Sequence, residues 1–149
     1  MKKKQFEICV RGVIQKQNKI LVCWHKEKKH YFFPGGHIEF GESAKKALIR
    51  ELKEELDIVV KKLSFIGTVE NIYIEKRDKY KEHLGKHHEI NLVFSVSAEK
   101  VKDKSLEDHI DFFFLDTKQF AKRRVLPLTL KKQVLKWLKD RKNFWITNE

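Results

Sequence analysis

The most informative part of this chain is the stretch Gly36-His37-Ile38-Glu39-Phe40-Gly41-Glu42-Ser43, together with the run 44–58 that follows it. Its glycines predict a turn, and Ser43 is a good N-cap for a helix that begins directly after it. From Ala44 to Leu56 the sequence has no Pro or Gly and is rich in strong helix formers. The sequence therefore predicts a helix over 44–56 that the chain enters through a glycine turn.

Three carboxylates lie on one side of this predicted helix. At roughly 100° per residue, Glu51, Glu54 and Glu55 fall within an arc of about 100°. Like charges at this spacing repel one another, and a divalent cation would remove that repulsion. Because carboxylate oxygens are hard ligands, the cluster favours Mg²⁺ or Mn²⁺. For these three residues alone, an ordinary solvated Glu-rich helix face is the alternative interpretation.

The spacing of the whole stretch resembles the signature of a known family. The Nudix hydrolases share the pattern Gly-x5-Glu-x7-Arg-Glu-U-x-Glu-Glu-x-Gly-U, with U aliphatic. The chain matches it at Gly36, Glu42, Arg50, Glu51, Leu52, Glu54, Glu55 and Ile58. The one departure is Asp57, where the family has Gly at the left-handed end of the helix. Asp tolerates that conformation better than most residues, so we expect a modest loss of stability and no effect on chemistry.

The resemblance implies an α/β (more narrowly α+β) fold, in which a mixed β-sheet lies between helices, and hydrolysis of a nucleoside diphosphate linked to a group X. It implies that Glu54, Glu55 and the Gly36 carbonyl hold Mg²⁺, with Mn²⁺ as the alternative ion. Glu51 is expected either to bind a second cation or to take the proton from water, as its family counterpart does in different members.

The remaining residues of the signature have supporting roles. Arg50 lies off the acidic arc, and we expect it to fix the carboxylates, together with Glu42, through charge-assisted hydrogen bonds. By the same resemblance, Gly35 and Gly36 let the Gly36 carbonyl point towards the helix. The signature therefore predicts catalytic roles for Glu51 and Arg50 and structural roles for Gly35 and Glu42.

Three candidates lie outside the signature. Glu89 precedes an apolar run over 90–96 that predicts a strand, and it resembles the extra carboxylate that many Nudix enzymes use as a metal ligand or base. A surface charge on an edge strand is the alternative. His25 and Lys26 follow a strand whose end lies near the substrate in the family, so both are candidate phosphate contacts, with ordinary loop charges as the alternative.

His83, His87 and His88 lie within a polar insertion over 76–88. Histidines four apart on a helix can bind zinc, but Gly85 interrupts such a helix and no Cys is nearby. Solvent-exposed histidines are the favoured interpretation.

Other segments indicate the order of elements. The run 6–24 predicts a β-hairpin, and a change of alternation across Arg11 and Gly12 suggests a bulge. Ile38 to Phe40 alternate as a short strand would. Leu126-Pro127 is expected to open a final helix whose residues Leu130, Val134, Trp137 and Leu138 form a core face.

Composition limits the class of protein. The 149 residues suit one domain, 1–149, with 41% hydrophobic and 36% charged residues. No apolar run is long enough to span a membrane. Cys9 and Cys23 form no disulfide framework and are expected to be buried thiols, which favours a reducing cytoplasm. The net charge of +12 favours anionic partners, and nucleic acid is an alternative that we do not favour because no nucleic-acid motif accompanies it.

The leading hypothesis is a Mg²⁺-dependent hydrolase, monomeric or homodimeric, that converts a nucleoside triphosphate or modified nucleoside triphosphate to the monophosphate and pyrophosphate. A second hypothesis takes a different X: a dinucleoside polyphosphate, a sugar nucleotide or the 5′ end of an RNA. A third is a nucleotide-binding module that keeps the fold without catalysis, against which the intact glutamates argue.

Overall fold

The computed structural model describes residues 6–74, 86–102 and 105–148 of the chain. Within them the elements follow in the order β1 (Glu7–Lys16), β2 (Lys19–His25), β3 (His30–Phe32), β4 (Gly35–His37), α1 (Ala44–Leu56), β5 (Val59–Ile74), β6 (Lys86–Lys100), β7 (Ile110–Asp116), α2 (Thr117–Lys122), β8 (Val125–Leu126), α3 (Leu128–Asp140) and β9 (Phe144–Thr147).

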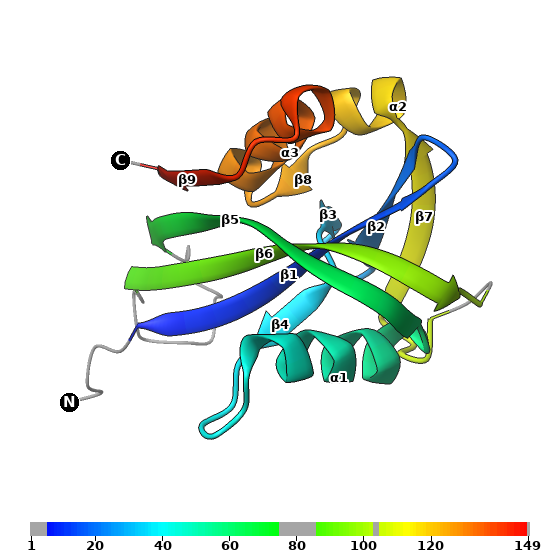
Figure 1. The fold of residues 1–149 in the computed structure, drawn as a ribbon, viewed down its shortest axis with the longest axis horizontal. Coiled ribbons are helices and arrows are strands. Elements are labelled where there is room, and N and C mark those ends of the chain that lie inside the picture. The colour runs from blue at the N-terminus through cyan, green and yellow to red at the C-terminus, as the bar shows by residue number, and fades with distance from the viewer. Residues whose placement is uncertain (1–5, 75–85, 103–104, 149) are drawn as a thin grey trace.

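The strands of the described residues form one mixed sheet in the order β8-β3-β2-β1-β6-β5-β9, with β4 paired to β1 and β7 paired to β2. β1 and β6 run parallel at its centre, and β6 pairs antiparallel with the long strand β5. Helix α1 lies on one face, and α2 and α3 lie on the other (Figure 1). The predicted α+β class, a mixed sheet between helices, is confirmed.

The two faces of the sheet carry separate hydrophobic cores, because successive residues of a strand point to opposite faces. On the α1 side, Val10 and Ile14 of β1 pack in a cluster with Leu48, Leu52 and other apolar residues of the helix. On the α3 side, the core holds Val13, Phe33, Leu130, Val134 and Trp137. The predicted core face of the final helix is confirmed.

The predicted hairpin over 6–24 is confirmed as β1 and β2, and its turn residues Gln17 and Asn18 both have positive φ. The predicted bulge at Gly12 is wrong, because the pairing of β1 with β6 continues without a register shift. β1 pairs with β4 only as far as Arg11 and with β2 from Gln15. The alternation is lost in the sequence because both faces of β1 are buried: Val13 packs in the core on the α3 side, and Ile14 packs in the core on the α1 side.

The predicted strand over 38–40 is also wrong. The short strand β4 ends at His37, and Phe40 is fully exposed in the turn that precedes α1. Three alternating residues bury too little surface to hold a strand when a turn follows directly. Both cysteines are buried and unpaired, as predicted, and burial raises the pKa of the Cys9 thiol to about 11.

Both ends of α1 are capped as the sequence predicts. The Ser43 hydroxyl accepts a hydrogen bond from the Lys46 amide at 3.3 Å. Asp57 has φ 51° and ψ 35°, the left-handed conformation, and its amide donates to the carbonyls of Leu52 and Lys53. The Asp57 carboxylate forms an ion pair with Lys102. Among the described residues, no helix has the length and apolar character needed to cross a membrane.

Replacing Asp57 by Gly and by Ala separates backbone strain from the ion pair with Lys102. Both substitutions remove the pair, but only Gly adopts the left-handed conformation without a steric penalty. We expect Asp57→Gly to have a free energy of unfolding about 1 kcal/mol higher than Asp57→Ala. Urea unfolding measures this difference. Equal stability of the two variants would show that the left-handed backbone at position 57 costs nothing.

Candidate active site

The turn that enters α1 brings a carboxylate against the backbone. A Cβ on Gly36 would lie 2.5 Å from the carboxyl carbon of Glu51, so no other residue fits without displacing that side chain. Gly35 has φ 145°, and a Cβ there would clash with the carbonyl of Val10 on the neighbouring strand. The two glycines therefore allow β4 to pair with β1 while the Glu51 carboxylate lies against Gly36.

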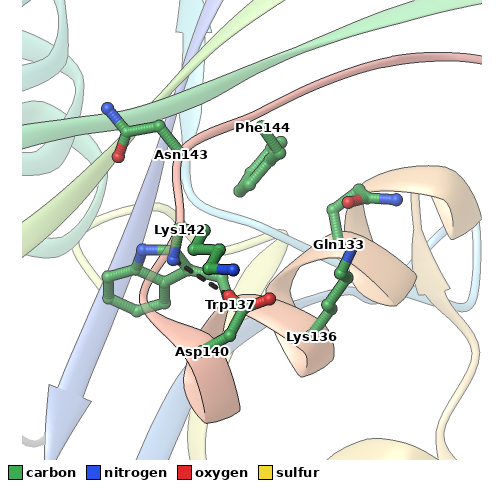
Figure 2. A pocket seen from close by; sticks show the side chains of 7 residues that line it. All are labelled: Gln133, Lys136, Trp137, Asp140, Lys142, Asn143 and Phe144. Carbon is green, nitrogen blue, oxygen red and sulfur yellow. Dashed lines mark hydrogen bonds between the residues drawn. The ribbon is translucent and has the colours of Figure 1, made fainter.

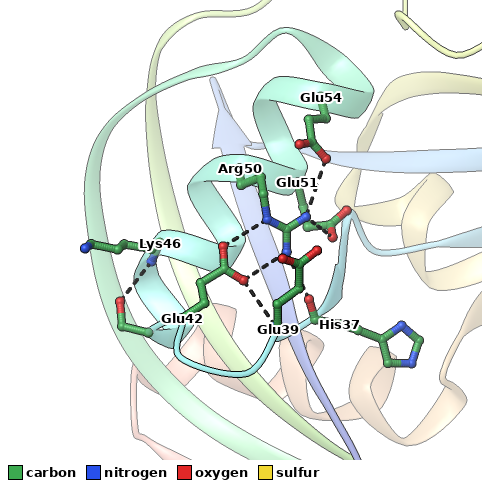
Figure 3. A network of polar contacts seen from close by, with 8 residues as sticks. His37, Glu39, Glu42, Lys46, Arg50, Glu51 and Glu54 are labelled. Carbon is green, nitrogen blue, oxygen red and sulfur yellow. Dashed lines mark hydrogen bonds and ion pairs between the residues drawn. The ribbon is translucent and has the colours of Figure 1, made fainter.

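Arg50 joins the carboxylates of the signature (Figure 3). Its Nε and Nη2 donate to the two carboxylate oxygens of Glu42 at 2.9 and 3.0 Å. Its Nη1 donates to Glu51 at 2.7 Å and to Glu54 at 3.4 Å, and Nη2 also donates to the His37 carbonyl at 3.2 Å. The hydrogen bond from Arg50 lowers the pKa of Glu42. These contacts are the ones that the predicted positioning role of Arg50 and Glu42 requires.

The ionised form of Glu55 is destabilised by its surroundings. Its Oε2 atom is buried and, within the described residues, has no hydrogen-bond partner. Burial first, and then the negative charges of Glu51 and Glu107, raise the pKa of Glu55 to about 8. A buried carboxylate oxygen without a donor is costly unless a cation or proton joins it.

The residues fit a hard divalent cation by their chemistry, because they supply carboxylate oxygens and one of these is buried without a partner. They are not gathered around a cation position, since no three Asp, Glu, His or Cys side chains of the described residues are grouped closely enough to hold a metal. Glu51 and Glu54 instead contact Arg50. Binding a cation here requires these carboxylates to turn from Arg50.

A cavity of about 670 Å³ is lined by residues of β1, β2, β3, β5 and β6, by the segment 124–129 and by Asn148. This volume suits a nucleotide-sized ligand. Its polar lining includes Arg11 of β1, Asn71 and Tyr73 of β5, Glu89 of β6 and Asn148 near the C-terminus. Long-range strand pairing brings these residues together, and apart from Glu89 none of them was predicted from the sequence as a site residue.

Glu89 lies in this cavity rather than on the surface, with 8% of its area exposed. Strand β6 lies between β1 and β5, so the alternative interpretation of an edge-strand charge is wrong. Its Oε1 accepts a hydrogen bond from the Tyr73 hydroxyl at 2.9 Å, and Oε2 contacts the Asn91 amide at 3.4 Å. The buried carboxylate of Glu89 therefore lines the cavity, where its oxygens can accept further hydrogen bonds from a ligand.

Arg11 is the functional candidate that the sequence analysis missed. Its Nε donates to the Asn91 side chain at 3.1 Å, and its Nη1 donates to the Phe33 carbonyl at 3.3 Å, just before the glycine turn. Its positive charge acts on Glu55, lowering the pKa of that carboxyl against the effect of burial. Arg11 therefore links the acidic helix to the cavity. The available signal was a single charge inside the apolar run 8–14.

His25 and Lys26, the two candidate phosphate contacts at the end of β2, have different surroundings in the structure. His25 lines the cavity, and its Nδ1 accepts a hydrogen bond from the Lys28 amide at 3.2 Å. Lys26 does not line the cavity: its Nζ donates to the Asp108 carbonyl at 2.7 Å and pairs with Asp111 at 3.4 Å. Phosphate contacts by either residue stay a prediction.

The zinc hypothesis finds no support in the described residues. His87 and His88 lie in strand β6, not on a helix. They pair with different carboxylates, His87 with Glu7 and His88 with Glu70, and both are partly buried. The expectation that they are solvent-exposed is therefore wrong. His83 lies outside the described residues.

A second, smaller cavity of about 140 Å³ lies between α3 and the start of β9 (Figure 2). Its polar lining includes Lys136, Lys142 and Asp140, whose carboxylate accepts a hydrogen bond from the Lys142 amide at 2.9 Å. This cavity is too small for a nucleotide, so the larger one is the candidate site.

Comparison with known proteins agrees with this geometry. A family model described as the NUDIX domain matches residues 3–138. The chain is 29% identical to the ADP-ribose pyrophosphatase of Methanocaldococcus jannaschii over 133 residues, 87% of this chain and 73% of that protein. It is 34% identical to the 8-oxo-dGTP diphosphatase of Proteus vulgaris over 73 residues, 46% of this chain and 65% of that protein.

A solved structure has the same fold. The MutT protein of Bacillus halodurans matches with a TM-score of 0.74 and 16% identity, over 95% of this chain and 88% of that one. The resemblance drawn from the signature is confirmed, and an enzyme is supported over a non-catalytic binding module. The family to which this chain belongs is that of the Nudix hydrolases, and the chain is a pyrophosphohydrolase.

Proposed function

We propose that the chain hydrolyses the phosphoanhydride of a nucleoside diphosphate linked to X, where the C-terminal half of α1 faces Gly36 of β4. The observation that carries this proposal is the buried Oε2 of Glu55, which has no hydrogen-bond partner among the described residues and lies on the same helix face as Glu51 and Glu54. This acidic face lies beside Gly36, against which the Glu51 carboxylate packs. A site of this kind attracts a hard cation and, through it, a phosphate chain.

Mg²⁺ is the proposed ion, and Mn²⁺ is the alternative. Glu51, Glu54 and Glu55 would hold it, together with the carbonyl of Gly36. Such an ion neutralises phosphate oxygens and makes bound water more acidic. Glu89 stays a proposed further ligand or base, and its buried position on the cavity face is compatible with either role.

The chain's own residues orient the reaction. Arg50 is a positioning residue, because it holds Glu42 through two hydrogen bonds and reaches Glu51 and Glu54 with the remaining nitrogen. The oxygen of a water molecule forms a bond to phosphorus while the bond from phosphorus to the bridging oxygen breaks. The proton of that water goes to Glu89, or to Glu51 in the alternative in which Glu51 does not bind the cation, and the leaving phosphate takes the electron pair.

The family acts on nucleotides, and we propose a nucleoside triphosphate, or a modified one, as the substrate, with the monophosphate and pyrophosphate as products. The similarity to an 8-oxo-dGTP diphosphatase supports this choice. The longer similarity to an ADP-ribose pyrophosphatase favours a second candidate, a nucleoside diphosphate attached to a sugar. A dinucleoside polyphosphate and an RNA 5′ end are further alternatives. We also propose a single domain over 1–149 that acts in the cytoplasm as a monomer or homodimer.

Glu54→Gln tests the metal assignment. The substitution removes one charge from the acidic face, at a side chain that is 59% exposed, so the fold should persist. We expect Mg²⁺-dependent turnover of nucleoside triphosphates to fall on the order of 100-fold. Glu99→Gln, an exposed charge at the far end of β6, is the matched control and should keep full activity. Unchanged turnover in Glu54→Gln would reject Glu54 as a ligand.

Glu55→Gln tests the strained carboxylate without measuring activity. The pKa of Glu55 is raised from 4.5 to about 8, so in the metal-free protein its ionisation costs stability progressively as the pH rises from 4.5 to 8. Gln carries no charge, and we therefore expect the metal-free variant to melt at the wild-type temperature near pH 4.5 and at a higher temperature at pH 9.

Addition of Mg²⁺ at pH 9 should reverse this order, because the cation stabilises the wild-type carboxylate and has lost a ligand in the variant. Thermal melts with EDTA and with Mg²⁺ give both comparisons. If the variant is no more stable than the wild-type protein at pH 9 in EDTA, the ionised Glu55 does not destabilise the metal-free protein and the raised pKa is wrong.

A further inference from the structure

Helix α1 covers part of the sheet face on which it lies and leaves the rest open. The apolar cluster beneath the helix includes Val10 and Ile14 of β1 and Phe94 and Val96 of β6. Strands β1, β6 and β5 extend past the N-terminal end of α1, and no helix of the described residues lies over that part of the sheet (Figure 1). The strand residues there have no described helix against which to pack.

Alternation along β1 places two large apolar residues on this open part of the face. Val10 packs in the cluster under α1, so Ile8 points to the same side of the sheet, and so does Phe6 before it. Phe6 directly precedes β1, and its ring contacts that of His88 on β6, with the ring centres 4.7 Å apart. Both residues therefore lie beside β6 on the α1 side of the sheet.

The strands at the other edge add two more. Val69 of β5 packs in the core on the α3 side, so alternation turns Ile74 to the α1 side. Phe144 and Ile146 of β9 pack in the same α3-side core, and Trp145 between them points to the α1 side. These side chains therefore share a face of the sheet with Ile8 and Phe6.

The pairing of the strands makes this face continuous. Ile8 lies opposite Ile90 of β6, Ile90 lies opposite Glu70 of β5, and Glu70 lies opposite Thr147 of β9. One row of side chains thus crosses four strands. Because neighbouring strands lie about 4.8 Å apart, the row is roughly 15 Å wide.

Four large apolar side chains of this surface are exposed, and we call them the open apolar face: Phe6 is 66% exposed, Ile8 47%, Ile74 62% and Trp145 68%. At these fractions, side chains of this size together offer roughly 500 Å² of apolar area. That is more than half of the about 800 Å² that each partner buries in a stable protein–protein interface. Aromatic residues such as Phe and Trp are also enriched in interfaces.

The chain has a net charge of +12, but this surface carries little of it. Among its described strand residues, Lys86 at the start of β6 is the one lysine or arginine, and the Glu70 carboxylate pairs with the His88 ring. A nucleic acid or an anionic membrane binds through several basic side chains, so neither suits this face. A second copy of the chain does, because two chains of charge +12 repel each other least where each carries little charge.

We propose that the open apolar face is the interface of a homodimer, in which two copies of the chain pack this face against each other about a twofold axis. A twofold axis sets the same patch of both copies together, which an apolar patch with few charges allows. This inference goes beyond the proposed function, and it selects the homodimer from the two states left open there. Its test requires neither a metal nor a nucleotide.

Sedimentation velocity of the wild-type protein, at concentrations from about 1 µM to about 100 µM, tests the dimer. We expect the mass to approach twice 17.9 kDa as the concentration rises. A wild-type protein that stays at 17.9 kDa up to about 100 µM would overturn the proposal, because the face would then be left to some other partner. Any larger assembly would also overturn it, since a twofold interface closes with two copies.

Two double variants with the same change of net charge locate the interface. Ile8→Lys with Trp145→Lys places charges in the open apolar face. Leu106→Lys with Phe113→Lys is the control, because these side chains are also exposed, at 58% and 44%, but precede and belong to β7, outside the face. We expect the dissociation constant of the dimer to rise at least about 100-fold in the first variant and to stay within about threefold in the control.

A milder variant covers the case in which lysines disturb the strands. Ile8→Thr with Trp145→Thr keeps residues that suit a strand, and far-UV circular dichroism and the melting temperature check its fold. We expect its dimer to dissociate with a constant at least about tenfold above that of the wild type. A dimer that is unchanged in this folded variant, or weakened equally in the control, would place the interface elsewhere and overturn the proposal.

Discussion

The hydrogen bonds of Arg50 to the carboxylates around it are the interaction on which the site depends. One guanidinium holds Glu42 through two nitrogens and reaches Glu51 and Glu54 with the third. A single positive charge does not balance this much negative charge. Burial first, and then the negative charges of Glu51 and Glu107, raise the pKa of Glu55. The acidic face is thus held in order without being neutralised, which leaves it able to attract a cation.

The fold joins this acidic face to the cavity through one strand. β1 pairs with β4 over its first half and with β2 at its end, and Arg11 lies where the first of these pairings stops. The core of α1 packs on one face of β1, and the cavity lies on the other. Arg11 acts on Glu55 of the acidic face and also lines the cavity, so its positive charge faces both.

The sequence predicted the helix and its acidic face because these depend on spacing within about one helical turn, which no distant contact alters. It predicted the α+β class because the family signature implies it. The cavity could not be predicted from the sequence. Tyr73 lies in β5, Glu89 lies in β6 and Arg124 directly precedes β8, and only strand pairing brings these residues together.

The errors have physical reasons as well. The change of alternation at Gly12 arose because both faces of β1 are buried, with Val13 in one core and Ile14 in the other, and no local pattern distinguishes this from a bulge. His87 and His88 looked like loop residues because the polar run continues into β6, where both pair with carboxylates. A charge within an apolar strand, as at Arg11, is the sequence signal that indicates a functional residue.

A crystal structure with Mn²⁺ and its anomalous scattering would identify the ion and its ligands together. We expect an anomalous peak bound by the carboxylates of Glu51, Glu54 and Glu55, with Glu51 and Glu54 turned away from Arg50 and with Arg50 still bound to Glu42. A peak elsewhere, or no peak while Glu51 and Glu54 remain bound to Arg50 at saturating Mn²⁺, would contradict it.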